Sequence, residues 1–370
     1  MFSRRAFAGR AFGGMIAAGL TEAAFAQRAS VPGAAPAGTV WLNGNEFPQG
    51  PPQASIDAMA QIIGSSNRYH YQEFPAFYSA LAASQGLEAD QILVGAGSSE
   101  VLHAAVEAFT SPTVPFIFPN PSYEAAPELA KYKGHAVIET PLNSRMAPDV
   151  RRMAAEARKA GGGLIYICNP NNPTSAITTS DDMAWLVANL PQNTYVLVDE
   201  AYLHYATSPE VSTSFPYVRE GKNVMVARTF SKIYGMAGLR VGYMAARPDL
   251  IARLEPYRNN VISIVSVRAV LAALEQGPKL LEERKAMIVR TRSELCDWLA
   301  AKKLKFIPPE ANFVMIETGR DAKQMQAAML AKGVAIGRPF PALNHMIRVS
   351  IGTDAEMAKF RKALSEVMAA

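Results

Sequence analysis

The stretch R-T-F-S-K-I-Y-G-M-A-G-L-R, residues 228–240, decides how the rest of the chain is interpreted. Lys232 follows the apolar run 224–227 and lies among small and hydroxyl residues, with Arg240 further along. This apolar, glycine-punctuated context favours a desolvated lysine, which loses its proton more easily and becomes a nucleophile. The alternative is an ordinary lysine at a strand end, with its charged tip in water. The rest of the sequence has to decide between the two.

Bulk composition predicts a large globular protein. The chain has 370 residues, 49% of them hydrophobic, which is enough for one large or two unequal domains. The formal net charge of +5 is small and scattered, so neither a nucleic-acid partner nor insertion into a membrane is expected. Cys168 and Cys296 lack metal-ligand spacing, so no metal site is expected.

The first 26 residues have the pattern of an export signal. Arg4 and Arg5 precede the apolar run 11–20, and Ala24-Phe25-Ala26 resembles a cleavage site. The paired arginines resemble the twin-arginine address, which predicts a periplasmic protein. The alternative is an untranslocated basic extension on a cytoplasmic protein. Residues 27–38 are rich in Ala, Pro and Gly and predict a linker.

Short apolar runs alternate with helical patterns through the middle of the chain. The expected strands lie at 91–94, 116–118, 136–139, 164–168, 195–199 and 224–227. Such alternation predicts a parallel sheet with right-handed crossovers, in which ligands gather at the carboxyl ends of the strands. Asn172, Asp199 and Lys232 each follow one of these strands. We therefore expect an amide, a carboxylate and a lysine at one edge of the sheet.

A fourth strand end carries a candidate anion site. The sequence G-A-G-S-S-E, residues 95–100, joins the first strand to a helical pattern at 101–109, with serines as expected caps. Free N–H groups and the positive end of the helix dipole would face a phosphate there. The order is not the dinucleotide fingerprint, and an ordinary capped helix is the alternative.

A lysine amine, a phosphate site and a carboxylate facing a ring nitrogen are what pyridoxal phosphate requires. The motifs N-P-N-N-P-T, D-E-A-Y, T-F-S-K and A-G-L-R occur here in one order. From about Thr39 to its end the chain thus resembles a fold-type I pyridoxal-phosphate-dependent aminotransferase of the histidinol-phosphate aminotransferase family. The resemblance implies an α/β fold like that of aspartate aminotransferase. A mostly parallel, helix-covered sheet forms its large domain, and both chain ends form a smaller α/β domain.

The resemblance also implies roles for individual residues. Lys232 would form the Schiff base (aldimine) with pyridoxal 5'-phosphate and carry the proton to and from the substrate's alpha carbon. Asp199 would pair with the pyridine nitrogen, while Asn172 and Tyr202 would hold the ring's phenolic oxygen. Tyr123 would stack on the ring. The residues implied to hold the phosphate are Gly97, Ser98, Ser99, Thr229, Ser231 and Arg240.

Three further residues are implied to act at the substrate or across subunits. Tyr69 matches a tyrosine that reaches the phosphate of the neighbouring subunit, which implies a homodimer with shared sites. Arg348 interrupts an apolar run at 347–350 and would bind a substrate carboxylate, or a substrate phosphate. Arg338 would be a second substrate-side arginine.

The resemblance to this family also predicts where the domains divide. The N-terminal arm and part of the small domain would span residues 39–75, the large cofactor-binding domain 76–264, and the small C-terminal domain 265–370. In the last of these, 277–304 has the apolar spacing of a helix, and 313–316 and 347–350 have the pattern of strands.

Two departures from the family pattern bear on the substrate. Ser175 stands where N-P-T-G ends in glycine, so the geometry of that loop is in question. Phe47 stands where N-x-N-E-Y-P has a tyrosine that helps to bind a substrate phosphate. With the export signal, this favours transfer of an amino group between a free amino acid, aromatic or bulky, and a 2-oxo acid. The alternatives are histidinol-phosphate transamination, oxidation, decarboxylation or racemisation on the same cofactor, and a binding protein without catalysis.

Overall fold

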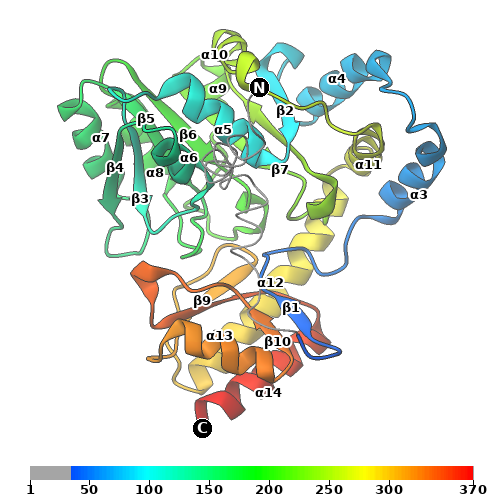
Figure 1. The fold of residues 1–370 in the computed structure, drawn as a ribbon, viewed down its shortest axis with the longest axis vertical. Coiled ribbons are helices and arrows are strands. Elements are labelled where there is room, and N and C mark those ends of the chain that lie inside the picture. The colour runs from blue at the N-terminus through cyan, green and yellow to red at the C-terminus, as the bar shows by residue number, and fades with distance from the viewer. Residues whose placement is uncertain (1–34, 370) are drawn as a thin grey trace, which may run out of the picture. The chain divides into compact units, whose positions relative to one another are not determined.

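The computed structural model describes residues 35–369, so the predicted signal at 1–26 and most of the linker lie outside the described residues. A seven-stranded sheet has the order β2-β8-β7-β6-β5-β3-β4. Figure 1 shows helices packed around it. The strands are β2 (Ile92–Ala96), β3 (Phe116–Asn120), β4 (Val137–Pro141), β5 (Gly163–Cys168), β6 (Thr194–Asp199), β7 (Val224–Thr229) and β8 (Val241–Ala245).

All strands of this sheet run in one direction except β8, which is antiparallel to both β2 and β7. The six expected strands are confirmed within a few residues, whereas β8 was not predicted. Because β8 begins where its neighbours end, Arg240, immediately before it, lies at the same edge as the other strand ends. β5 and β7 are buried along their whole length, as expected for strands covered by helices on both faces.

Helices and turns connect these strands. The helices of this part are α3 (Gln53–Ile62), α4 (Phe74–Ser84), α5 (Ser98–Phe109), α6 (Ala125–Tyr132), α7 (Val150–Lys159), α8 (Ser180–Ala188), α9 (Phe215–Arg219), α10 (Pro248–Leu254) and α11 (Ile264–Leu274). α5 begins earlier than predicted. Gly97, with φ of 81°, is its N-cap, so Ser98 and Ser99 are in its first turn and the expectation that they cap it was wrong.

The two chain ends combine in a second group of elements. β1 (Val40–Leu42) pairs in parallel with β10 (Val334–Ile336), and β9 (Phe313–Glu317) pairs antiparallel with β11 (Met346–Ser350). The long helix α12 (Gly277–Ala301), α13 (Ala322–Ala331) and α14 (Asp354–Ala369) complete this group (Figure 1). The predicted architecture, with a smaller α/β domain from both chain ends, is thereby confirmed.

The boundaries predicted after residues 75 and 264 stay predictions. Single 3-10 turns interrupt the connections at η1 (Ile63–Ser65), η2 (Tyr71–Glu73), η3 (Ala89–Gln91), η4 (Leu203–Tyr205), η5 (Ala237–Leu239), η6 (Glu255–Tyr257) and η7 (Pro341–Leu343). Between residues 35 and 369, no helix combines the length and the apolar character needed to cross a bilayer.

Candidate active site

Lys232 lies in the loop that follows β7, and its surroundings lower its basicity. Its Nζ donates a hydrogen bond to the carbonyl oxygen of Gly44 at 3.1 Å and lies 5.5 Å from the centre of the Tyr202 ring. Burial, followed by the positive charge of Arg348, lowers the pKa of Lys232 to about 8. The lowered basicity expected from the sequence is therefore present in the structure, and about a tenth of this amine is neutral at pH 7.

Asp199 ends β6 and is 2% exposed. The Tyr166 hydroxyl donates to Asp199 Oδ2 at 3.1 Å, and the amide of Ala201 donates to Oδ1 at 3.2 Å. Burial raises the pKa of Asp199 to about 6, and these two donors oppose that rise. Sequence reasoning missed Tyr166, although a hydroxyl within the aliphatic run of β5 is a signal that a buried partner exists.

Small residues let Arg240 approach the first turn of α5 closely. A Cβ on Gly97 would lie 2.3 Å from Arg240 Nη2, and one on Gly242 would lie 2.2 Å from the amide nitrogen of Ser98. Arg240 itself has φ of 54° and donates to Ala237 O at 3.1 Å and to Ser231 Oγ at 3.4 Å. The guanidinium and the helix N-terminus are therefore held side by side by glycines that no larger residue could replace.

Hydroxyl groups complete this cradle. Thr229 Oγ1 donates to Ser231 Oγ at 2.9 Å and accepts from the Ser231 amide at 3.1 Å. Two sources of positive potential, the guanidinium and the helix dipole, thus meet beside several donors. These donors suit a phosphate dianion. The residues present therefore fit a cofactor that carries a phosphate group. The structure brings together the six residues predicted to hold phosphate: Gly97, Ser98, Ser99, Thr229, Ser231 and Arg240.

Arg348, on β11, is 8% exposed and is held by two loops. Its Nη1 donates to Asn172 Oδ1 at 2.6 Å and its Nη2 donates to Asn43 O at 2.9 Å, while its Nε is buried without a hydrogen-bond partner. Burial lowers its pKa to about 10. A buried guanidinium with an unsatisfied donor is stabilised by a carboxylate, so the site fits an anionic group at this point.

Tyr202 lies between Lys232 and the second group of elements. Its hydroxyl accepts a hydrogen bond from Asn45 Nδ2 at 3.2 Å, and its ring meets the edge of Phe313 at 5.0 Å between centroids. Asn45 also accepts from the Ser350 hydroxyl at 3.1 Å. Asn45 was not predicted as a residue of the site.

Tyr123 and Arg338 lie at the margin of the cluster. Tyr123 follows β3, close enough to Tyr166 and Arg348 to affect their pKa values. Arg338 forms an ion pair with Glu124. Its guanidinium lies 4.2 Å from the centre of the Phe340 ring, and that of Arg348 lies 5.2 Å from the same ring. The two predicted substrate-side arginines are therefore neighbours.

Two predicted residues, Phe47 and Tyr69, make no hydrogen bond or ring contact with this cluster among the described residues. Phe47 is 4% exposed, and its ring lies 4.3 Å from the guanidinium carbon of Arg284, beside a cavity of about 350 Å³ that Ser231 also lines. Tyr69 is 72% exposed and stacks on Tyr71, with centroids 5.0 Å apart. The contact of Phe47 with substrate and that of Tyr69 with a neighbouring subunit stay predictions.

The loop that ends in Ser175 keeps the backbone conformation that a glycine favours. Ser175 has φ of 64° and is fully buried. Its amide donates to Asn171 O at 2.6 Å, which closes the turn around Asn172. The substitution of serine for glycine therefore leaves the turn in place, and Asn172 reaches Arg348.

The cluster thus joins an amine of lowered pKa, a buried carboxylate, an anion cradle and an arginine whose Nε has no hydrogen-bond partner. The model of the class I and II aminotransferase family matches residues 37–364. The chain is 33% identical to an aromatic amino acid aminotransferase of Cutibacterium acnes, over 89% of this chain and 92% of that protein. It is 34% identical to a histidinol-phosphate aminotransferase of Symbiobacterium thermophilum, over 89% and 90% of the two chains.

A solved structure gives the same result. The histidinol-phosphate aminotransferase of Sinorhizobium meliloti, in complex with pyridoxal-5'-phosphate, superposes with a TM-score of 0.82 at 27% identity. The match covers 89% of this chain and 90% of that one. With the family model spanning nearly all of the described residues, the chain belongs to the class I and II aminotransferases.

Proposed function

We propose that this pyridoxal-phosphate-dependent aminotransferase moves the amino group between a free amino acid with an aromatic or other bulky side chain and a 2-oxo acid. The observation that carries the proposal is Arg348. Its guanidinium is fixed by Asn172 and Asn43, its Nε lacks a partner, and the rings of Phe313 and Phe340 flank it at 5.5 and 5.2 Å. Such a group fits one carboxylate in apolar surroundings.

Pyridoxal phosphate supplies an aldehyde that bonds to amines and a ring that accepts the electron pair released at a substrate's alpha carbon. In the proposed assignment, Arg240 and the first turn of α5 bind its phosphate. Asp199 keeps the ring nitrogen protonated, and Asn172 and Tyr202 orient the ring through its phenolic oxygen. Tyr123 covers one face of the ring.

Lys232 has the protonation behaviour that the reaction needs. Since its pKa is lowered to about 8, its Nζ accepts a proton from the alpha carbon and returns it to the product near neutral pH. Asp199 is buried beside the Tyr166 donor, which favours its charged form. Asp199 ends β6, and Lys232 lies three residues after the end of β7, so both follow strands of the same sheet.

Charge around Arg338 favours a substrate with a single anionic group. Glu124 forms an ion pair with Arg338, so the cluster of Arg348, Arg338 and Glu124 has one net positive charge. A substrate carboxylate balances that charge, whereas a second anion would face the Glu124 carboxylate. Phe47 agrees with this, since it lacks the hydroxyl that the family pattern uses for a substrate phosphate.

Histidinol phosphate is the second candidate substrate. It is supported by relatives such as those of Symbiobacterium thermophilum and Nitrosococcus oceani, which are named histidinol-phosphate aminotransferases. Competition between histidinol phosphate and phenylalanine distinguishes the two candidates. A higher kcat/KM for histidinol phosphate would replace the proposed substrate.

The experiment that tests the proposal is a substrate screen on purified, cofactor-loaded protein. Each amino acid is added without an acceptor, and the absorbance of the bound cofactor is followed. We expect phenylalanine, tyrosine or tryptophan to convert the cofactor at the lowest concentrations. No conversion by any amino acid and 2-oxo acid pair would refute the assignment.

The proposal includes a homodimer in which Tyr69 completes the neighbouring site. Exposed apolar side chains in the same stretch of chain support it, since Ile56, Ile63 and Tyr71 are all exposed and Tyr71 stacks on Tyr69. Mixing Lys232→Ala and Tyr69→Ala variants tests it. If Tyr69 acts across the interface, mixed dimers contain one native site and recover activity. If it acts within its own subunit, mixing restores nothing.

Export to the periplasm is the remaining part of the proposal, and it rests on the sequence of residues 1–26. Fractionation of cells, with mass spectrometry of the mature N-terminus, tests it. Cleavage after Ala26 in the periplasmic fraction is expected. Replacing Arg4 and Arg5 with lysine should leave the protein inside the cell, and a full-length cytoplasmic protein in the wild type would overturn the expectation.

A further inference from the structure

Ser175 occupies a backbone conformation that is unfavourable for any residue with a side chain. Its φ of 64° lies in the left-handed region, and the residue is 0% exposed. Glycine adopts this conformation without the steric cost that a Cβ brings. A serine kept there indicates that its hydroxyl makes contacts that glycine would lose.

The hydroxyl joins the Asn172 loop to the segment before β9. Ser175 Oγ accepts hydrogen bonds from the amides of Glu310 at 3.0 Å and Ala311 at 2.7 Å. We call this pair of contacts the Ser175 bridge. The Ser175 carbonyl oxygen also accepts a hydrogen bond from the Glu310 amide at 3.1 Å. The Glu310 amide therefore keeps a partner without the hydroxyl, whereas the contact with the Ala311 amide depends on the hydroxyl alone.

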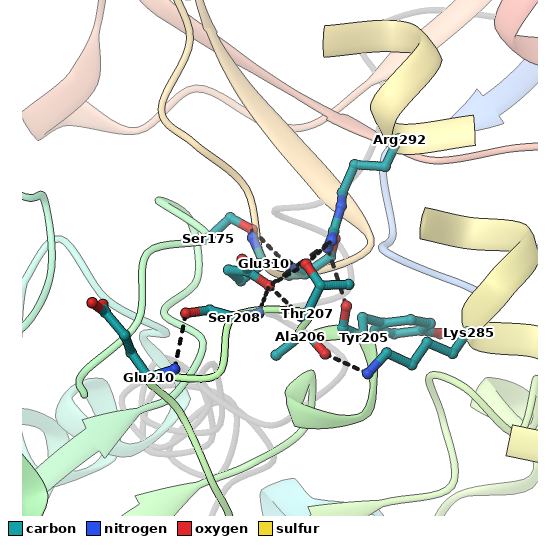
Figure 2. A network of polar contacts seen from close by, with 10 residues as sticks. Ser175, Tyr205, Ala206, Thr207, Ser208, Glu210, Lys285, Arg292 and Glu310 are labelled. Atoms are coloured by element: carbon teal, nitrogen blue, oxygen red, sulfur yellow. Dashed lines mark hydrogen bonds and ion pairs between the residues drawn. The ribbon is translucent and has the colours of Figure 1, made fainter. Parts of the chain in front are cut away.

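The segment that the bridge reaches is fixed from its other side as well. The Glu310 carboxylate accepts from the amides of Thr207 at 2.5 Å and Ser208 at 3.3 Å, and Arg292 Nη1 donates to Ala311 O at 2.9 Å. Figure 2 shows Ser175, Thr207, Ser208 and Arg292 gathered around Glu310. The segment is therefore a rigid element to which Ser175 attaches its own loop.

The next residue of that segment holds the loop over Lys232. Asn312 Nδ2 donates to the carbonyl oxygens of Asn45 at 3.0 Å and Glu46 at 3.3 Å. The same loop offers Asn43 O to Arg348 and Gly44 O to Lys232. A continuous set of contacts thus runs from the Ser175 hydroxyl to the second anchor of Arg348.

Arg348 is therefore held between two loops whose separation the Ser175 bridge sets. Asn172 lies three residues before Ser175 in the first loop, and Asn43 lies in the loop held by Asn312. We propose that Ser175 is a positioning residue whose hydroxyl fixes the Arg348 guanidinium for the substrate carboxylate. This rests on the proposed function, in which Arg348 binds that carboxylate.

The test compares Ser175→Gly and Ser175→Ala with the wild type. Glycine removes the hydroxyl and also relieves the steric cost of the left-handed backbone. The Ser175→Gly variant therefore reports the loss of the Ser175 bridge without added backbone strain, and it remains informative if the alanine variant fails to fold. We expect KM for phenylalanine to rise about fivefold or more, with kcat within about twofold. Ser212→Gly, which removes an exposed hydroxyl that contacts Ser180, is the control.

Two probes, each carrying only one of the two polar groups of phenylalanine, identify what is lost. 3-Phenylpropionate carries the carboxylate without the amine, and 2-phenylethylamine carries the amine without the carboxylate. Only 3-phenylpropionate should bind more weakly to Ser175→Gly than to the wild type. Equal losses for both probes, or no loss for either, would overturn the role of Ser175. A wild type that neither binds 3-phenylpropionate nor transaminates phenylalanine would instead overturn the proposed function.

Discussion

Removing the Tyr166 hydroxyl should shift the protonation of Asp199 and, through it, the affinity for the cofactor. In Tyr166→Phe, Asp199 Oδ2 loses a donor at 3.1 Å. A hydrogen bond to a charged group contributes roughly 1.5–3 kcal/mol, and one pKa unit corresponds to about 1.4 kcal/mol. The pKa of Asp199, already raised to about 6 by burial, should therefore rise by roughly one to two units.

The rise in the pKa of Asp199 predicts the direction of change in two quantities, the stability of the apoprotein and its affinity for pyridoxal phosphate. Asp199 releases its proton less readily in the folded apoprotein than in the unfolded chain, so its contribution to stability is largest at low pH. That contribution falls as the pH rises from about 4 to about 6 in the wild type, and the fall should continue to about 7–8 in the variant. Cofactor binding needs the ionised carboxylate, so at pH 7 the variant should bind pyridoxal phosphate roughly twofold to tenfold more weakly. At pH 9 the two proteins should bind it equally.

Titration of apoprotein with pyridoxal phosphate from pH 5 to pH 9 measures the effect on binding. Chemical denaturation of the apoprotein from pH 4 to pH 8 measures the effect on stability. Tyr205→Phe is the matched control, because Tyr205 is fully buried and its hydroxyl has no hydrogen-bond partner within the described residues. It should leave the pH dependence of binding unchanged. If Tyr166→Phe gives the same pH profile as the wild type, Tyr166 does not tune Asp199 and the reasoning fails.

Three other substitutions test separate parts of the site. Lys232→Ala should abolish transamination together with the absorbance of covalently bound cofactor, and surviving turnover would remove Lys232 from its assigned role. Arg228→Met leaves the buried carboxylate of Glu200, 2.7 Å away, unpaired and should lower the free energy of unfolding by roughly 3–5 kcal/mol in chemical denaturation. A drop below about 1 kcal/mol would show that the pair is dispensable. Glu124→Gln should release Arg338 and lower KM for glutamate roughly twofold to fivefold without changing that for phenylalanine, and an equal change in both would exclude charge selection.

Much of the fold and half of the site could be predicted because local patterns carry them. Buried strands such as β5 and β7 are continuous apolar runs, and each ends at a polar group that must face the same edge in a parallel sheet. Asp199 and Lys232 follow from that rule alone. β8 was missed because its direction depends on pairing with β2 and β7, which no local pattern records.

The contacts that were missed are long-range. Asn45 reaches Tyr202, 157 residues away, and Ser350, 305 residues away, and Ser175 reaches Glu310. A hydroxyl or amide at these positions is compatible with any surface turn, so the sequence gives no sign of its partner. Ser175 shows the difference well. The sequence shows that serine stands where the family pattern has glycine. Only the structure shows that the Ser175 hydroxyl accepts hydrogen bonds from two backbone amides.

The positions of the charges also couple substrate binding to the basicity of Lys232. The positive charge of Arg348 is the second largest influence that lowers the pKa of Lys232, after burial. In the proposed assignment, a substrate carboxylate pairs with Arg348 and cancels much of that charge. Lys232 then becomes a stronger base when the substrate is in place, because the repulsion that favoured its neutral form is weaker. A single arginine would thus both select the carboxylate and set the basicity of Lys232, so Arg348 and Lys232 should not behave independently in double variants.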